Sequence, residues 1–223
     1  MRTLKKNLTV LVLLLLTTTL YSFDLPTHWF KAGSNPNSYE MGLDTVAGMD
    51  GKAVSTIKSI DSKIDGFGTL MCDSLPDKYW GKRIRMSGYL KTKDVSEWSG
   101  FWLRIDGKDS RNSLGFDNMH DGKNNRSIKG STDWKKYEIV LDVPAEASNI
   151  AFGALLVGTG QIWFQDLAFD VVDESVPTTG LSMTGRGGDV INYIIIFSLG
   201  ILLGGVIIGL VWAINSRKRR NAK

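Results

Sequence analysis

The residues best suited to chemistry in this sequence are those that could hold a sugar. Tyr89, Trp102 and Arg104 combine two aromatic rings with a planar cation, and Asp117 and Asn118 follow in a polar stretch. A sugar ring stacks its apolar C–H faces on aromatic rings and hydrogen-bonds its hydroxyls to planar polar side chains. Trp102 and Arg104 share one face of an alternating segment, and Tyr89 has the same outward phase in the segment before it. If the two segments pair as neighbouring strands, these residues form one ligand-binding patch.

The alternative for this patch is structural. Trp102 can instead pack beneath a loop or on a second sheet face, as tryptophans in β-sandwiches commonly do. The facing of Trp102 therefore decides between a sugar platform and a packing role.

Motifs for catalysis are absent from the sequence. It has no Gly-x-Ser-x-Gly elbow, no phosphate-binding loop, and no Cys and His pair with an orienting partner. A glycosidase needs two carboxylates about 5–9.5 Å apart across a cleft, and most acids between residues 106 and 121 are typical of turns. We therefore expect a non-enzymatic protein, with a carboxylate pair assembled from distant segments as the open alternative.

The first 22 residues indicate a signal peptide. Arg2, Lys5 and Lys6 are basic, residues 8–20 are apolar, and Ser22 is a small residue at the expected cleavage edge. The apolar stretch is too short to cross a bilayer comfortably. The alternative is an uncleaved N-terminal anchor helix.

Residues 191–214 predict one transmembrane helix. The segment INYIIIFSLGILLGGVIIGLVWAI has no charge, and at about 1.5 Å per residue it is long enough for a hydrocarbon core of about 30 Å. The basic tail, residues 215–223, marks the cytoplasmic side. We expect a single-pass protein of the plasma (inner) membrane with its N-terminus outside. Glycines four residues apart (GILLG, GVIIG) suggest a homo-oligomer through this helix.

Residues 174–190 predict a flexible linker, because small and polar residues dominate them. Two stretches, VPTTG at 176–180 and LSMTG at 181–185, resemble the Leu-Pro-x-Thr-Gly peptide of Gram-positive sorting substrates. That peptide is also followed by an apolar run and a basic tail, but each stretch departs from it at one position. The alternative localisation is therefore the cell wall, after cleavage near Thr179 or Thr184.

Residues 23–173 predict one all-β domain, since about 150 residues suffice for one domain and period-two alternation recurs along them. Strands are expected at 53–60, 68–73, 83–90, 101–105, 113–116, 137–143, 150–157 and 161–172. Residues 150–157 are apolar on both faces, which is typical of a central strand. Short strands with Gly-rich turns indicate an antiparallel β-sandwich.

The last of these segments changes its inward phase. Ile162 and Phe164 share one phase and Leu167 has the opposite one, so we expect a β-bulge near residues 165–166. The bulge leaves the facing of Trp163 open.

Several motifs of this domain resemble a known group of proteins. They are YWGKRIRMSGYLKT from residue 79, GFWLRIDG from 100, FDNM from 116, GSTDWKKYE from 130 and GQIWFQDL from 160. Over most of residues 29–172 the chain resembles mostly uncharacterised bacterial extracellular domains, which are similar to carbohydrate-binding modules of the galactose-binding-like jelly-roll fold. The resemblance implies a jelly roll that often binds sugars, and it implies no reaction.

The resemblance also implies a possible structural Ca²⁺, which in such modules often joins the N-terminal strand region to the last strand. Glu40, Asp44 and Asp166 are placed to be its ligands, and carboxylates of this hard-oxygen type suit calcium. Solvated carboxylates are the alternative.

The leading hypothesis is a membrane-anchored extracytoplasmic protein whose jelly roll binds a glycan or another surface polymer. The net charge of +4 comes largely from the two ends of the chain, so nucleic acid is not an expected partner. One alternative is a structural or assembly protein of the cell envelope that binds another protein. The other is a glycan-acting hydrolase.

Overall fold

The computed structural model describes residues 23–182, apart from residues 75, 109–112 and 122–123. In chain order its elements are β1 (Phe30–Ala32), η1 (Pro36–Ser38), β2 (Tyr39–Asp44), β3 (Val54–Ser59), β4 (Phe67–Ser74), η2 (Asp77–Tyr79), β5 (Lys82–Gly107), β6 (Ser113–Asp117), β7 (Ile128–Val143), β8 (Ala147–Val157), β9 (Gln161–Val172) and β10 (Leu181–Ser182). All paired strands in this part are antiparallel, which confirms the expected all-β sandwich.

The described ranges contain no helix with the length and apolar character needed to cross a bilayer. The predicted signal peptide (1–22), transmembrane helix (191–214) and basic tail (215–223) lie outside these ranges.

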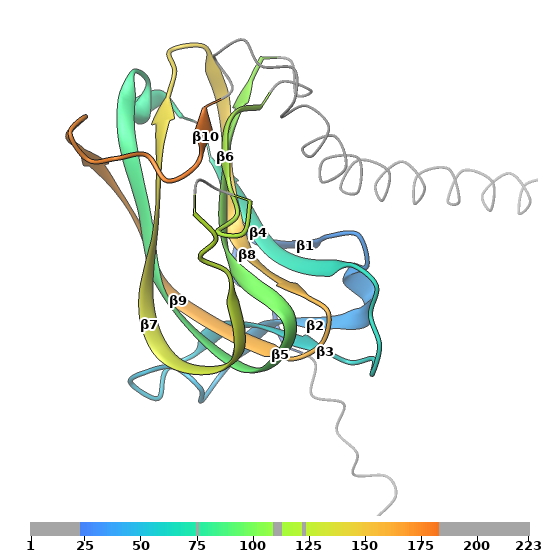
Figure 1. Ribbon diagram of the computed structural model, residues 1–223. Coiled ribbons are helices and arrows are strands. Elements are labelled where there is room, and N and C mark those ends of the chain that lie inside the picture. The colour runs from blue at the N-terminus through green and yellow to red at the C-terminus, as the bar shows by residue number, and fades with distance from the viewer. Residues whose placement is uncertain (1–22, 75, 109–112, 122–123, 183–223) are drawn as a thin grey trace, which may run out of the picture.

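One strand, β5, belongs to both layers of the sandwich. Its first part pairs with β7 and β9, and its last part pairs with β8 and β6. The register shifts repeatedly between Leu90 and Ser99, and in Figure 1 the strand runs down one side and turns up the other. The prediction of two separate strands here, 83–90 and 101–105, is wrong. Residues 91–99 contain neither Gly nor Pro, and the change of layers coincides with register shifts around Asp94, whose φ of 52° is left-handed.

The two layers are defined by this division of β5. The first layer contains β2, β3, β9, the first part of β5 and β7. The second layer contains β1, β4, β8, the last part of β5, β6 and β10. Strand β8 lies between β4 and β5, and its Leu155 and Leu156 are both fully buried although they point to opposite faces. This confirms the prediction of a central strand at residues 150–157.

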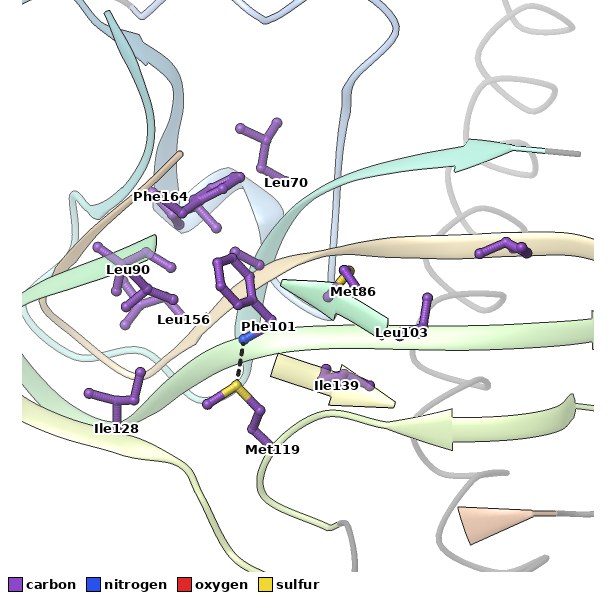
Figure 2. Packing of buried hydrophobic residues seen from close by; sticks show 14 of the residues in the cluster. Leu70, Met86, Leu90, Phe101, Leu103, Met119, Ile128, Ile139, Leu156 and Phe164 are labelled. Carbon is purple, nitrogen blue, oxygen red and sulfur yellow. Dashed lines mark hydrogen bonds between the residues drawn. The ribbon is translucent and has the colours of Figure 1, made fainter. Parts of the chain in front are cut away.

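Apolar side chains from both layers meet in the main core. Figure 2 shows Phe101 among Leu70, Leu156 and Phe164, with Phe101 and Phe164 in edge contact at 6.1 Å between ring centroids. The Phe101 N–H also donates to the sulfur of Met119 at 3.3 Å. Burial of each such side chain contributes roughly 1.5–3 kcal/mol, so this shared interior holds the layers together.

The predicted bulge in β9 is confirmed. Ser87 pairs with Ala168 and Tyr89 with Gln165, so two residues of β9 oppose Gly88. Asp166 has a φ of 55°, the left-handed conformation that such an extra residue often adopts. The bulge lets residues on both sides of it face the core, and it leaves Trp163 facing outward.

Residues 173–182, called the strap here, close one side of the sandwich. The backbone N–H of Thr179 donates to Val140 O at 2.9 Å, and the Thr179 hydroxyl accepts the Val140 N–H at 2.9 Å. Farther along, Leu181 pairs with Phe116 of β6. The strap thus crosses from β7 of the first layer to β6 of the second.

A flexible linker over 174–190 is therefore wrong for its first half. Arg83 reinforces the strap by donating to the carbonyls of Glu174 and Val176 at 2.5 and 2.8 Å. The physical reason is that the edge strand β7 has backbone groups to satisfy, and Thr179 satisfies both groups of Val140. The rest of the predicted linker, residues 183–190, lies outside the described ranges.

Candidate functional site

Trp102 faces away from the main core, as predicted, but it is only 1% exposed. Its indole N–H donates to Thr69 Oγ1 at 2.8 Å. Trp102 is paired with Gly153 of β8, which has no side chain, and Gly153 is paired in turn with Met71, two residues from Thr69. Trp102 belongs to a second apolar cluster with Phe67, Met71, Phe116, Ala151 and Leu155. The packing alternative therefore describes Trp102, and its ring is not presented to a sugar.

Arg104 shares the outward face of Trp102, and its guanidinium is already paired. Its Nε donates to Asp106 Oδ1 at 2.7 Å and its Nη2 to Asp106 Oδ2 at 3.1 Å. Asn149 donates to the same carboxylate at 3.2 Å. This bidentate pair fixes the rim of β5, and it does not lie beside Tyr89.

Asp117 and Asn118 are fully buried and shape the loop after β6. Asp117 accepts the Met119 N–H at 2.7 Å and an Arg126 N–H at 2.5 Å. Asn118 accepts the backbone N–H of Asp121 at 2.7 Å and donates to its carboxylate at 2.8 Å. The predicted polar rim for a ligand is thus used for internal hydrogen bonds.

Tyr89 lies in the other layer, partly exposed on its outer face. It pairs with Gln165 of β9 on one side and with Lys136 of β7 on the other. Trp163 is two residues from Gln165 and directly opposite Lys91. Diagonal neighbours of this kind are about 7–8 Å apart between their backbones, within reach of two aromatic side chains. The predicted patch is therefore divided, and only Tyr89 has an accessible aromatic neighbour.

We call this surface the Tyr89–Trp163 face. It comprises Tyr89, Lys91, Lys136, Gln161, Trp163 and Gln165. The sequence analysis left Trp163 undecided and missed its neighbours. The signal that could have found them is the alternation Gln161-x-Trp163-x-Gln165, which places three flat polar or aromatic groups on one face before the bulge.

Hydrogen bonds fix the orientation of this face. The indole N–H of Trp163 donates to Asp44 Oδ2 at 2.9 Å. Gln161 donates to Thr56 Oγ1 at 3.1 Å, and Gln165 Oε1 accepts the Met49 N–H at 3.0 Å. These contacts hold an aromatic ring flanked by two side-chain amides at a half-exposed surface. Such a surface can stack a pyranose ring and hydrogen-bond its hydroxyls.

The structure does not bring the three predicted calcium ligands together. Asp44 is engaged by Trp163 and by the Val46 N–H, and Asp166 accepts a hydrogen bond from Gln165. Glu40 lies on β2 opposite Lys58. Among the residues that the structure describes, no three His, Cys, Asp or Glu side chains are placed to hold a metal ion. This corrects the predicted ligand set.

Comparison with known proteins gives one curated relative, and no family model matches the chain. The relative is an uncharacterised HTH-type transcriptional regulator, YbfP, of Bacillus subtilis (strain 168), 43% identical over 159 residues. The match includes 71% of this chain and 52% of the relative, so the chain spans about half of the relative's length. A helix-turn-helix needs α-helices, and the described part of this chain contains none.

Among solved structures, the enzymatically active domain of tailspike protein 4 from bacteriophage CBA120 is similar with a TM-score of 0.50. It is 9% identical, over 66% of this chain and 20% of that one. The CBM22-1 xylan-binding domain of Paenibacillus barcinonensis Xyn10C has a TM-score of 0.47, 9% identity and coverage of 68% and 90%. A Stig cyclase from Fischerella sp. TAU has a TM-score of 0.49 and 11% identity, over 70% of this chain and 91% of that one. At such identity the tailspike likeness shows the fold alone.

Proposed function

We propose that this chain is a glycan-recognition protein that presents its β-sandwich on the outer side of the membrane. The observation that carries the proposal is the Tyr89–Trp163 face. It combines two partly exposed aromatic rings with two amide side chains on neighbouring strands. Sugar-binding surfaces have this composition, because a pyranose needs an apolar platform and in-plane hydrogen-bonding groups together.

Preorganisation supports this role. Asp44 holds the Trp163 indole, so a ligand that stacks on the ring does not first have to immobilise it. The same applies to Gln165, whose carbonyl oxygen is held by Met49 N–H and whose amide donates to Asp166 Oδ2 at 2.9 Å. Binding to fixed side chains avoids about 0.5–1.5 kcal/mol of ordering cost for each of them.

The proposed anchor is the uncharged segment at residues 191–214. The strap is docked to residue 182, so the proposed spacer contains only residues 183–190, which span at most about 28 Å when extended. The domain would therefore recognise a polymer close to the membrane surface.

Of the two proposed localisations, membrane anchoring is favoured over cell-wall attachment through cleavage near Thr179. Both its N–H and its hydroxyl bind Val140, and Gly180 beside it is buried. A transpeptidase reads an extended peptide, so the strap would have to leave the domain before cleavage. Thr184 lies outside the described ranges.

The experiment is a glycan array probed with the purified full-length chain in detergent, followed by titration of the best ligand. We expect Trp163→Ala and Tyr89→Ala each to weaken binding about tenfold, equivalent to ~1.4 kcal/mol. Trp80→Ala is the matched control, because Trp80 is 47% exposed but lies after η2 and contacts Ala147 instead. Binding that survives both test substitutions would refute this site. No binding to any glycan would refute the function.

A further inference from the structure

Four lysines lie on or directly beside the Tyr89–Trp163 face: Lys91 and Lys136 within it, and Lys58 and Lys93 beside its Gln161. We infer that its ligand is an acidic glycan, one that carries carboxylate or phosphate groups along the polymer. The inference rests on the proposed function and assigns the chemical class of its ligand.

The strand register places the lysines around the aromatic pair. Lys58 and Lys93 oppose Gln161 from its two sides, on β3 and β5. One step along the sheet, Lys91 opposes Trp163, with its Nζ 6.0 Å from the ring centroid. Because adjacent strands are about 4.8 Å apart, these ammonium groups lie within one or two sugar units of the platform.

The fourth lysine lies on the opposite side of the aromatic pair. Lys136 of β7 is the direct partner of Tyr89. A polymer stacked on Tyr89 and Trp163 would therefore have cations on both of its sides, which suits a chain with an anionic group on successive units.

Few carboxylates neutralise these lysines. Lys91 is 3.9 Å from Asp133, whose side chain is 89% exposed, so the pair is weak. Lys93 and Lys136 form no ion pair within 4.0 Å with any residue that the structure describes. Two carboxylates lie near this face: Asp44, which accepts the Trp163 N–H, and Glu40, which is the register partner of Lys58.

The neighbouring part of the same outer face is arranged differently. Arg85 has two carboxylates at 3.7 Å, Glu138 and Asp170. Arg85 thus has carboxylate partners on two sides, whereas Lys93 and Lys136, beside the aromatic pair, have none within 4.0 Å among the described residues. Lysine acts as a mobile point charge rather than a rigid fork, which suits anions at several positions along a flexible polymer.

The test compares polymers that differ in charge, with the full-length chain in detergent. The probes are polygalacturonate, the same polymer fully methyl-esterified, poly(glycerol phosphate) and neutral galactan, titrated at about 10 and 150 mM NaCl. We expect one of the two acidic polymers to bind at least about tenfold more tightly than the neutral ones at low salt. The difference should shrink at about 150 mM, where the Debye length falls to about 8 Å. Which acidic polymer binds distinguishes carboxylate from phosphate.

The variant pair is Lys93→Gln with Lys136→Gln, two exposed side chains whose loss should not affect folding. We expect about four- to 25-fold weaker binding of the acidic polymer, at about a two- to fivefold effect per lysine. Lys31→Gln, which removes one positive charge from β1 in the other layer, is the control for the effect of one lysine. Equal binding of neutral and acidic polymers, without salt dependence, would overturn the inference while keeping the proposed function. If the unmodified chain bound none of these polymers and no other glycan, both the inference and the proposed function would be overturned.

Discussion

The substitution Trp102→Phe tests whether this tryptophan is part of the packing or of a binding site. It removes the indole N–H that donates to Thr69 Oγ1 at 2.8 Å, a net loss of about 1 kcal/mol. Thr69 keeps its other bond, to Ala154 O at 2.7 Å, so no buried donor is left without a partner. The smaller ring leaves a space in a cluster where Leu155 and Ala151 are 0% and 1% exposed, which adds about another 1 kcal/mol.

The expected loss is thus about 2 kcal/mol of unfolding free energy. For a domain of this size, that corresponds to a fall in Tm of about 4–8 °C. Circular dichroism of the full-length chain in detergent measures it. Trp80→Phe is the matched control, because the Trp80 N–H also donates one hydrogen bond, to Ala147 O at 2.9 Å, but Trp80 is 47% exposed. There water replaces the lost bond, and we expect a fall of under about 4 °C.

Glycan binding by the same variant completes the test. We expect Trp102→Phe to bind any ligand of the Tyr89–Trp163 face as well as the unmodified chain does. An unchanged Tm together with weakened binding would refute the reasoning, because it would make Trp102 a ligand contact rather than a packing residue.

Three further predictions concern the strap and the single cysteine. Thr179→Val removes the hydroxyl that accepts the Val140 N–H. We expect the ratio of amide hydrogen-exchange rates in the strap to those in the core to rise at least about tenfold over the unmodified chain. An unchanged ratio would contradict the docking of the strap. Hydrogen bonds from Ser175 lower the pKa of Asp173, so its carboxylate favours the folded turn above the ordinary pKa, and this contribution is lost as pH falls through the lowered value. An NMR titration midpoint at or above about 3.9 would argue against it. Burial raises the pKa of the Cys72 thiol and lowers its thiolate fraction, so iodoacetamide at about pH 8 should react more slowly with the folded than with the urea-unfolded chain; equal rates would exclude this shift.

Local alternation was enough to predict which side chains face the main core. Phe101 and Leu103 are inward and buried as expected, because a sandwich strand buries one face throughout its length. The β9 bulge could also be predicted from the sequence, because an inserted residue reverses the inward phase within a single strand. The path of β5 could not be predicted from the sequence. Its division between two layers depends on partners far away in the sequence, and neither Gly nor Pro marks the place where it changes layers, only Asp94 with its left-handed φ.

The candidate site was harder to predict for a related reason. Alternation assigns Trp102 and Arg104 to the outward face, and this is where they lie, but it does not say whether that face is buried. A signal was present in β4, where Phe67 and Met71 make the outward phase apolar too. The composition of the strap predicts a flexible linker, yet its single residue Thr179 binds the edge strand β7 through both its backbone N–H and its hydroxyl.

Because β5 is a member of both layers, neither layer can be completed before the other. Its four partner strands, β6 to β9, all come later in the chain, and the Tyr39 hydroxyl donates to Gly158 O, 119 residues farther on. Long loops must therefore close before most contacts become favourable, which places folding in the slow range of about milliseconds to seconds. During that time unpaired strand edges are exposed, so a substitution at the bend of β5 would affect the yield of folded protein before it affected the ligand surface.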